Sequence, residues 1–209
     1  MRIYCINTII LFPEGLHQDK RWLGDFSSGF TKMAFETAEK SDFKTEVFIQ
    51  PACNHYSNYF GIRNEMIIKF GTPISITPFY ELYKTKPRTA QRQVIAAAHK
   101  QIEDLMLNIT DLENYEAIDF IRNIYGRKYA LAQGLNPKHF PNMLESDKNL
   151  FANLEKAKSE NADKVLGIYR KALDYKNTLK ELNITDNEVV CNNVMALPNI
   201  PQLALPDTM

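Results

Sequence analysis

The sequence predicts an α/β fold in which a mixed sheet is flanked by helices and is followed by an all-helical C-terminal region. Strand-like apolar runs and helical stripes alternate along the first 110 residues, whereas strand signals vanish beyond residue 110. Apolar residues make up 44% of the chain and charged residues 24%, which is the composition of a folded globular protein. We therefore expect an α/β portion over residues 1–110, a helical extension over 111–196 and an extended proline-rich tail over 197–209.

The first expected elements are a strand and a helix. Ile3–Phe12 is a short isoleucine-rich run that stops at Pro13, and this pattern predicts a buried strand that ends in a turn. A helix is expected to begin at Ser27 or Ser28, where a hydroxyl side chain can cap it. Its apolar residues recur at helical spacing, at Phe30, Met33, Ala34 and Ala38.

The second expected strand is Thr45–Ala52. Val47 and Ile49 fall on one face of this β-prone run and Phe48 falls on the other, which indicates an inner strand buried on both faces. Pro51 lacks a backbone N–H, so the strand must end there or lie at an edge.

Two further strands and a long helix complete the predicted α/β portion. Glu65–Phe70 is a strand candidate, the sequence Gly71–Pro73 is a turn signal, and Ile74–Ile76 resumes an extended pattern. A strong helix is expected from about Thr89, because apolar residues recur there at steps of three and four: Val94, Ala97, Ala98, Ile102, Leu105, Met106 and Ile109.

Helical patterns alone fill the following residues. One stripe contains Ile118, Ile121 and Tyr125 and is expected to stop at Gly134. Asp147 is expected to cap another helix, whose apolar residues are Leu150, Leu154 and Ala157. A further helical stripe follows a break at residues 161–163, with Val165, Leu166, Tyr169, Leu173 and Leu179.

Composition disfavours several classes of function. Lys+Arg and Asp+Glu are equal at 25 each, so bulk nucleic-acid binding is not expected. No apolar run approaches the roughly 20 residues of a membrane span, and the N-terminus does not resemble a signal peptide. The cysteines are odd in number and scattered, which disfavours a disulfide scaffold or a zinc cluster and favours a reducing compartment: Cys5, Cys53 and Cys191.

The segment Leu11–Arg21 carries the most informative chemistry. A predicted strand delivers the carboxylate of Glu14, then Gly15, then the cations Lys20 and Arg21. Ligands of open α/β sheets bind beyond the carboxyl ends of strands, and a glycine lets backbone amides approach a phosphate closely. The two cations could neutralise that phosphate. The same residues are also typical of a turn at the end of a strand with solvent-exposed charges. Taken alone, the segment favours this turn over a phosphate-binding site, because such short patterns recur by chance.

The order of four sequence pieces resembles the glycerolipid acyltransferases, the 1-acyl-glycerol-3-phosphate acyltransferase family. Phe12–Gly15 is similar to the third sequence block of that family, and Phe26–Ala34 contains a glycine at a helix start, as the family does next. Val47–Pro51 is similar to the fourth block, and Ile67–Ile74 is similar to the Phe-Gly-x-Pro-Ile segment that follows it. The resemblance covers about residues 7–77, so it implies an incomplete acyltransferase core with a helical extension.

This resemblance implies transfer of a fatty acyl group from a thioester carrier to a glycerol-phosphate-type hydroxyl. In the family the third block holds the glycerol and the phosphate of the acceptor, which would place Phe12, Pro13, Glu14 and Gly15 at the acceptor, with Glu14 and Gly15 in the binding positions. Pro51 corresponds to the proline of the fourth block, whose role is one of shape.

Two departures from the family pattern limit what can be carried over. The family continues with Gly-Thr-Arg, whereas this chain has Gly15-Leu16-His17, so Lys20 or Arg21 would have to take the place of the phosphate-binding arginine. His17 is equally well interpreted as a functional neighbour of Glu14 or as a plain loop histidine.

The second departure concerns the catalytic base. In the family a histidine of a His-x4-Asp motif takes the hydroxyl proton, and this motif precedes the third block. Here only eleven residues precede Phe12, so the chain holds no such motif at that place. His99 and Asp104 have the spacing but follow the block. Five residues apart on a helix is about 140° around the axis, so we reject them as a catalytic pair.

Two other groups of residues have both a functional and a structural interpretation. Cys53 and His55 lie two residues apart on one strand face, but no third group orients them, so packed strand residues are the favoured interpretation. Tyr56, Tyr59 and Phe60 form an aromatic segment that could contact an acyl chain or a membrane interface, with local packing slightly favoured.

The resulting expectation is the acceptor-binding half of an acyltransferase, with no catalytic residue of its own and no cofactor. Its partners would be acyl-CoA or an acyl carrier protein, a glycerol-phosphate or lysophospholipid-type acceptor, and the cytoplasmic face of a membrane, with no nucleic acid. Met1 is expected to be an internal start, the product of a truncated gene or the first residue of an incomplete chain, and the unpaired strand edge could then pair with a missing N-terminal portion. The alternative is a non-catalytic lipid-binding or protein-interaction remnant.

Overall fold

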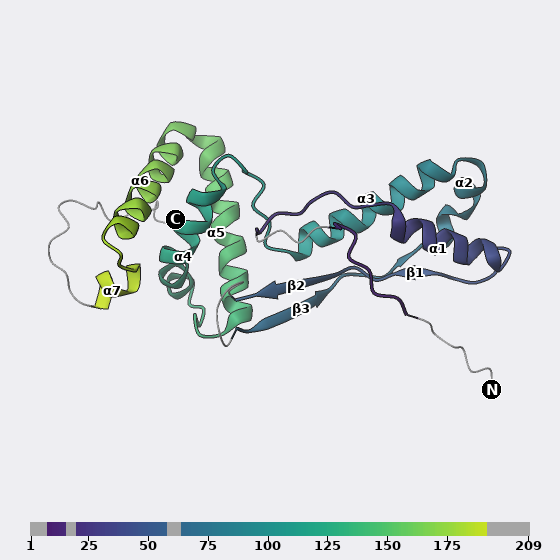
Figure 1. The fold of residues 1–209 in the computed structure, drawn as a ribbon, viewed down its shortest axis with the longest axis horizontal. Helices are drawn as coiled ribbons and strands as arrows, with labels where there is room; N and C mark the ends of the chain where they lie inside the picture. The colour runs from purple at the N-terminus through teal and green to yellow at the C-terminus, as the bar shows by residue number, and fades with distance from the viewer. Residues whose placement is uncertain (1–7, 16–19, 58–63, 192–209) are drawn as a thin grey trace. The chain divides into compact units, whose positions relative to one another are not determined.

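The computed structural model describes residues 8–15, 20–57 and 64–191, and it divides the chain into two compact units (Figure 1). Unit 1 spans Met1–Asn108 and unit 2 spans Ile109–Met209. The described residues are mostly helical, and their strands form two small antiparallel sheets, all in unit 1.

The described residues of unit 1 form three α-helices: α1 (Gly29–Lys40), α2 (Tyr80–Thr85) and α3 (Pro87–Leu105). A short 3₁₀ helix, η1 (Thr77–Phe79), precedes α2. Helix α1 begins after Ser28, as expected, although the Ser28 hydroxyl makes no capping hydrogen bond and the Thr31 hydroxyl instead donates to the Ser28 carbonyl. The short helix α2 was not expected from the sequence.

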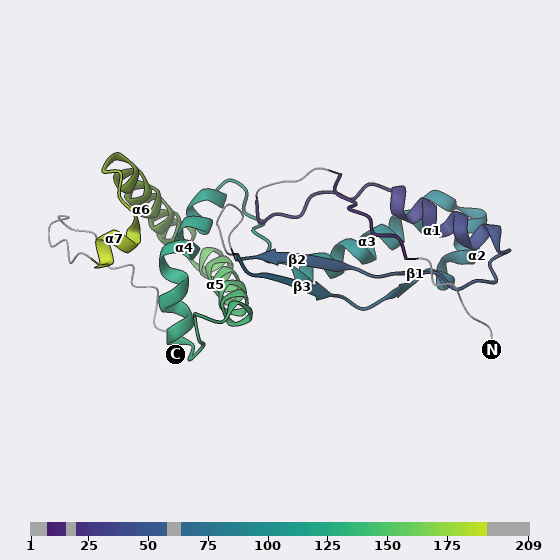
Figure 2. The same cartoon turned by 60° about the horizontal axis from the view of Figure 1, so that its bottom comes forward.

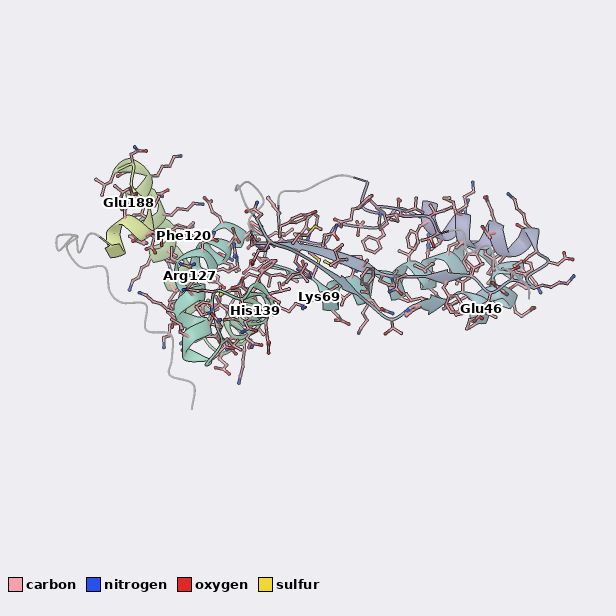
Figure 3. All side chains as sticks on the ribbon, turned by 90° about the horizontal axis from the view of Figure 1, so that it is seen from below. Glu46, Lys69, Phe120, Arg127, His139 and Glu188 are labelled. Atoms are coloured by element: carbon pink, nitrogen blue, oxygen red, sulfur yellow. The ribbon has the colours of Figure 1, made fainter. Side chains whose placement is uncertain are left out.

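The strands of unit 1 form one interrupted hairpin. Strand β1, Phe48–Ile49, pairs with β4, Ile74–Ser75, and strand β2, Ala52–Tyr56, pairs with β3, Met66–Phe70. Glu46, labelled in Figure 3, accepts a hydrogen bond from the Ser75 hydroxyl beside the first pair.

A bulge separates the two pairs of strands. Ile49 lies opposite Ile74 and Ala52 lies opposite Phe70, so two residues on one strand face three, Gly71–Pro73, on the other. One extra residue of this kind kinks a ribbon and increases its twist. The bulge is fixed by a hydrogen bond of 2.9 Å from the Gly71 N–H to the Pro51 carbonyl.

The core of unit 1 lies between α1, α2, α3 and the β1–β4 pair. Phe35 stacks on Tyr83 with 4.2 Å between ring centroids, and the Tyr80 hydroxyl donates to the Thr45 carbonyl. The buried side chains of this cluster are Phe35, Ala38, Ile76, Tyr80, Ala90 and Val94. Strand β2 lies against α3 farther along the ribbon (Figures 1 and 2).

The described residues of unit 2 form helices joined by short connections, with no strand among them. Helices α4, Tyr115–Ala132, α5, Phe140–Glu160, and α6, Ala162–Glu181, pack against one another, and α7 spans Asp186–Cys191. The predicted break at residues 161–163 is confirmed, since Asn161 ends α5 and its side chain caps α6 by accepting from the Lys164 N–H.

Asp147 is not a helix cap, contrary to expectation. It lies inside α5 with its side chain 7% exposed, and Arg122 on α4 approaches it at 3.4 Å. A Cβ added to Gly126 would lie 3.1 Å from the Asp147 carboxylate, so this glycine lets α4 and α5 approach closely. A buried ion pair, which the helical pattern does not reveal, replaces the predicted cap.

Three strand expectations are not met by the described residues. A mixed sheet is not present among the described residues, because both sheets are antiparallel and two-stranded. Residues 8–12 form no strand, since no described strand lies beside them, and residues 3–7 lie outside the described part. Phe48 is 54% exposed, so the ribbon is buried on one face only. The strands at Glu65–Phe70 and Ile74–Ile76 were placed correctly.

The helices were predicted more reliably. The stripe on α3 is confirmed, with Val94 and Ala98 buried, although the helix begins at Pro87 and ends at Leu105. On α1 the core-facing side is rotated from the expected one, because Met33 is 42% exposed. Among the residues that the structure describes, no helix is both long and apolar enough to cross a membrane. The predicted tail, 197–209, lies outside the described residues.

We expect Gly71→Ala to lower the free energy of unfolding of unit 1 by about 1–3 kcal/mol. A Cβ there would lie 2.4 Å from the Gln101 side-chain oxygen, 3.3 Å from Leu105 and 3.4 Å from Pro51. The Gln101 oxygen also accepts from the Thr72 N–H, so moving it costs a hydrogen bond. Denaturant unfolding followed by the fluorescence of Trp22, the single tryptophan, measures the change.

Gly29→Ala is the matched control for this substitution. Its added Cβ would meet no atom nearer than Ser27 Oγ at 4.0 Å, and alanine favours a helix over glycine. We expect unchanged or higher stability for Gly29→Ala; an equal loss in both variants would contradict the close approach at Gly71.

Candidate functional site

The predicted acceptor-binding block forms a tight turn. The Gly15 N–H donates to the Phe12 carbonyl at 3.3 Å, which closes the turn over Pro13 and Glu14. Gly15 has φ +70°, a left-handed conformation that glycine adopts without the penalty of a side chain. No atom lies within 4 Å of a Cβ built at Gly15, so backbone conformation and not crowding requires glycine here.

The loop after this turn is pinned where it returns. The Glu14 carboxylate accepts from the Gly24 N–H, ten residues further along, at 3.3 Å. The Ser27 N–H donates to the Pro13 carbonyl at 2.8 Å, and the Leu23 N–H donates to the Asn108 side chain at 3.1 Å. We call the described residues of this stretch, 14–15 and 20–24, the pinned loop.

The two candidate cations of the pinned loop differ in environment. Lys20 is exposed, as a ligand for a phosphate in solution must be. Arg21 is only 7% exposed, so its guanidinium belongs to the packed side of the loop in this structure. Of the two cations, Lys20 is therefore the one whose side chain is open to an anion in solution. His17 lies outside the described residues.

A run of exposed apolar side chains leads directly into the turn. Ile9, Ile10, Leu11 and Phe12 are 64%, 79%, 45% and 79% exposed, respectively. Extended residues alternate between opposite sides, so exposure of four in succession means that neither side of this segment is covered. The chain thus passes from an open apolar segment to a polar loop within a few residues.

Pro51 occupies a structural position. It is buried beside the bulge, and the Gln50 side-chain amide donates to both the Pro51 and the Gly71 carbonyl. The hairpin therefore brings together the fourth-block proline and the later glycine of the resemblance. Among described residues, no hydrogen bond joins this pair to the turn at Gly15.

The remaining polar candidates differ in burial: His55 is buried, Cys53 and His99 are half-buried, and Asp104 is exposed. His55 is 4% exposed on β2, with Cys53 half-buried on the same face. His99 lies on α3, and its ring centroid is 4.9 Å from that of Phe26. Asp104 lies on the same helix, which is the placement on which their rejection as a catalytic pair was based. Tyr59 and Phe60 lie outside the described residues.

Sequence reasoning missed the residues that hold the loop. Leu23 and Asn108 are 85 positions apart, and no local pattern signals a contact over that distance. Gly24 and Ser27 also lay outside the predicted site, although a glycine beside an aspartate is a common turn signal.

Unit 2 has an open depression of about 600 Å³ between α4, α6 and the start of α7. Lys176 pairs with Glu116 at 2.8 Å on its wall, and the Lys176 hydrogen bond keeps the pKa of Glu116 below its usual value. Burial and the hydrogen bond to Asp186 raise the pKa of the nearby Tyr175 to about 12. Within the described ranges, no group of three or more His, Cys, Asp or Glu side chains could hold a metal ion.

Comparison of the chain with protein-family models, with curated proteins and with solved structures finds no match.

We expect Glu14→Ala to speed hydrogen exchange of the Gly24 amide about fivefold, because one hydrogen bond is worth about 1 kcal/mol. Glu14→Gln keeps a side-chain oxygen that can accept from the same N–H. It should therefore exchange close to the wild-type rate. Amide exchange followed by NMR measures both variants, and equal exchange in the two would show that Glu14 does not pin the loop.

Proposed function

We propose that unit 1 binds a glycerol-phosphate or lysophospholipid-type acceptor for acyl transfer. The observation that carries the proposal is the junction at Phe12, where four exposed apolar side chains meet the turn and the pinned loop. A lysophospholipid has the same order of chemistry, an apolar chain joined to a glycerol and a charged phosphate. The ordered pieces that resemble glycerolipid acyltransferases support the same substrate class.

In this proposal each part of the junction has one task. The Glu14 carboxylate, exposed and held by one amide, accepts a hydrogen bond from a glycerol hydroxyl. Lys20 attracts the phosphate, and the Gly15 turn lets backbone approach it without a side chain in the way. The side chains of Ile9 to Phe12 cover the start of the acyl chain.

The proposed reaction is acyl transfer from a thioester, acyl-CoA or an acyl carrier protein. The acceptor oxygen attacks the thioester carbonyl, a C–O bond forms and the C–S bond breaks. The hydroxyl proton passes to a histidine base and then to the leaving sulfur, which departs as a thiol, so no cofactor is consumed. We propose that the histidine and aspartate come from a polypeptide paired with this chain.

The proposed place of action is the cytoplasmic face of a membrane, to which the protein binds peripherally. Lysophospholipids reside in bilayers, so an acceptor site must reach the interface. The exposed segment ending at Phe12 offers apolar side chains of the kind that insert at such an interface.

The same exposed segment favours a second candidate, lipid binding or protein interaction without catalysis. Both proposed functions use the exposed residues 9–12 to bind lipid or a partner. Only acceptor binding for acyl transfer also requires Glu14 and Lys20, which would bind the polar headgroup. Binding of a headgroup separates the two.

We expect 1-acyl-glycerol 3-phosphate, supplied as monomers, to shift the NMR amide signals of Gly15 and Gly24 and to bind Lys20→Ala about tenfold more weakly, equivalent to 1.4 kcal/mol. Lys40→Ala, at the far end of α1, is the control and should bind as the wild type does. Binding that Lys20→Ala leaves unchanged would exclude Lys20 as the phosphate ligand.

We also expect acyl transfer when this chain is co-expressed with a polypeptide that carries a His-x4-Asp motif. Release of CoA from acyl-CoA should require both polypeptides, and Glu14→Ala should reduce it more than Glu65→Ala, which alters another exposed carboxylate of unit 1. CoA release by this chain alone at an enzyme-like rate would overturn the proposed division of labour. Equal effects of the two substitutions would overturn the site.

A further inference from the structure

Strand β3 is an edge strand of unit 1. It pairs with β2 on one side, and no other strand of the described residues pairs with it. Figure 1 shows β3 on the side of the ribbon away from α3, and Figure 2 agrees. Its outer edge is therefore not covered by the helix that packs on the ribbon.

The hydrogen bonds of the ribbon determine which backbone groups point outward. Gly71 donates to Pro51, and Ser57 donates to the Glu65 carbonyl, so both pairs are hydrogen-bonded pairs of the same ladder. Such pairs recur at every second residue of an antiparallel ladder. Hence the odd-numbered residues of β3 face β2, and the N–H and C=O groups of Met66, Ile68 and Phe70 face outward.

The same three residues carry exposed apolar side chains. Met66, Ile68 and Phe70 are 53%, 46% and 66% exposed and share one face of the strand. Natural edge strands are usually protected by an outward charge or a proline. The one charge of β3, Lys69, is half-buried on the opposite face (labelled in Figure 3).

We propose that a second copy of this chain pairs with β3, antiparallel and centred on Ile68. In this register all five residues of the strand pair, and the outward N–H and C=O groups of each copy meet those of the other. Met66 lies opposite Phe70 of the second copy, and Ile68 lies opposite itself on the two-fold axis. The product is a four-stranded sheet shared by two copies.

The strand is complementary to itself, because in this register the exposed apolar residues Met66, Ile68 and Phe70 face one another and no like charges meet, and this favours a second copy as the occupant of the edge. In the register centred on Ile68, Lys69 lies opposite Ile67 of the second copy, so the two lysines do not face each other. The chain carries 25 basic and 25 acidic residues, so two copies do not repel each other through net charge.

A charge-swap experiment tests the register directly. The wild type should shift from the monomer mass of 24.1 kDa toward twice that mass in sedimentation velocity as its concentration rises from about 1 µM to about 1 mM. Ile68→Lys and Ile68→Glu should each stay monomeric, because like charges then meet on the axis. An equimolar mixture of the two variants should form a heterodimer, since lysine then faces glutamate.

Leu131→Lys is the matched control, because Leu131 is 61% exposed on α4, in unit 2. It should dimerise as the wild type does. A wild type that stays monomeric, a dimer that both Ile68 variants retain, or a mixture that forms no heterodimer overturns the proposal. A monomer that binds phosphatidylglycerol vesicles through Ile68 would also overturn it and would assign this face to a membrane. None of these outcomes depends on Glu14 or Lys20.

Discussion

The structure of unit 1 depends on one extra residue in its hairpin. Side chains alternate between the faces of a strand, so a single inserted residue exchanges the two faces beyond it. Before the bulge Ile68 and Phe70 point away from the helices, and after it Ile76 points into the core with no exposed surface. All three are even-numbered, and a regular ladder would place them on one face.

Because of the bulge, one end of the hairpin packs into the core of unit 1 and the other end has an exposed apolar face. Its β1–β4 end forms a wall of the core with α1, α2 and α3, where Ile76 and Tyr80 are buried. Its β2–β3 end is covered by α3 on one side only. A two-stranded ribbon is marginally stable by itself in water, so this end relies on the packing around Gly71 and Gln101 and offers an apolar edge. The exposed edge is a consequence of how the core is closed.

The sequence predicted what local pattern can encode. The stripe on α3, the strand predicted over Glu65–Phe70 and the break predicted at residues 161–163 follow from local spacing and turn signals, and all three are present. The turn signal at Gly71–Pro73 was recognised, but its pairing partner, which makes it a bulge, lies about twenty residues away. Asp147 was misjudged for the same reason, since its partner Arg122 is on another helix. In the candidate site, the sequence predicted the turn that ends at Gly15. It did not predict that the amides of Gly24 and Ser27 hold this segment, because those contacts form between residues ten or more positions apart.

The pinned loop and the edge strand are held by separate contacts within unit 1. Glu14 bonds to Gly24, Pro13 to Ser27 and Leu23 to the Asn108 side chain, so the loop is fastened to its own return and to the residues after α3. The ribbon is fastened to α3 through Thr72 and Gln101 instead. Because no residue of β3 takes part in the bonds that close the loop, pairing of two copies at Ile68 leaves the turn at Gly15 in place. The proposed headgroup site and the proposed interface therefore depend on different hydrogen bonds.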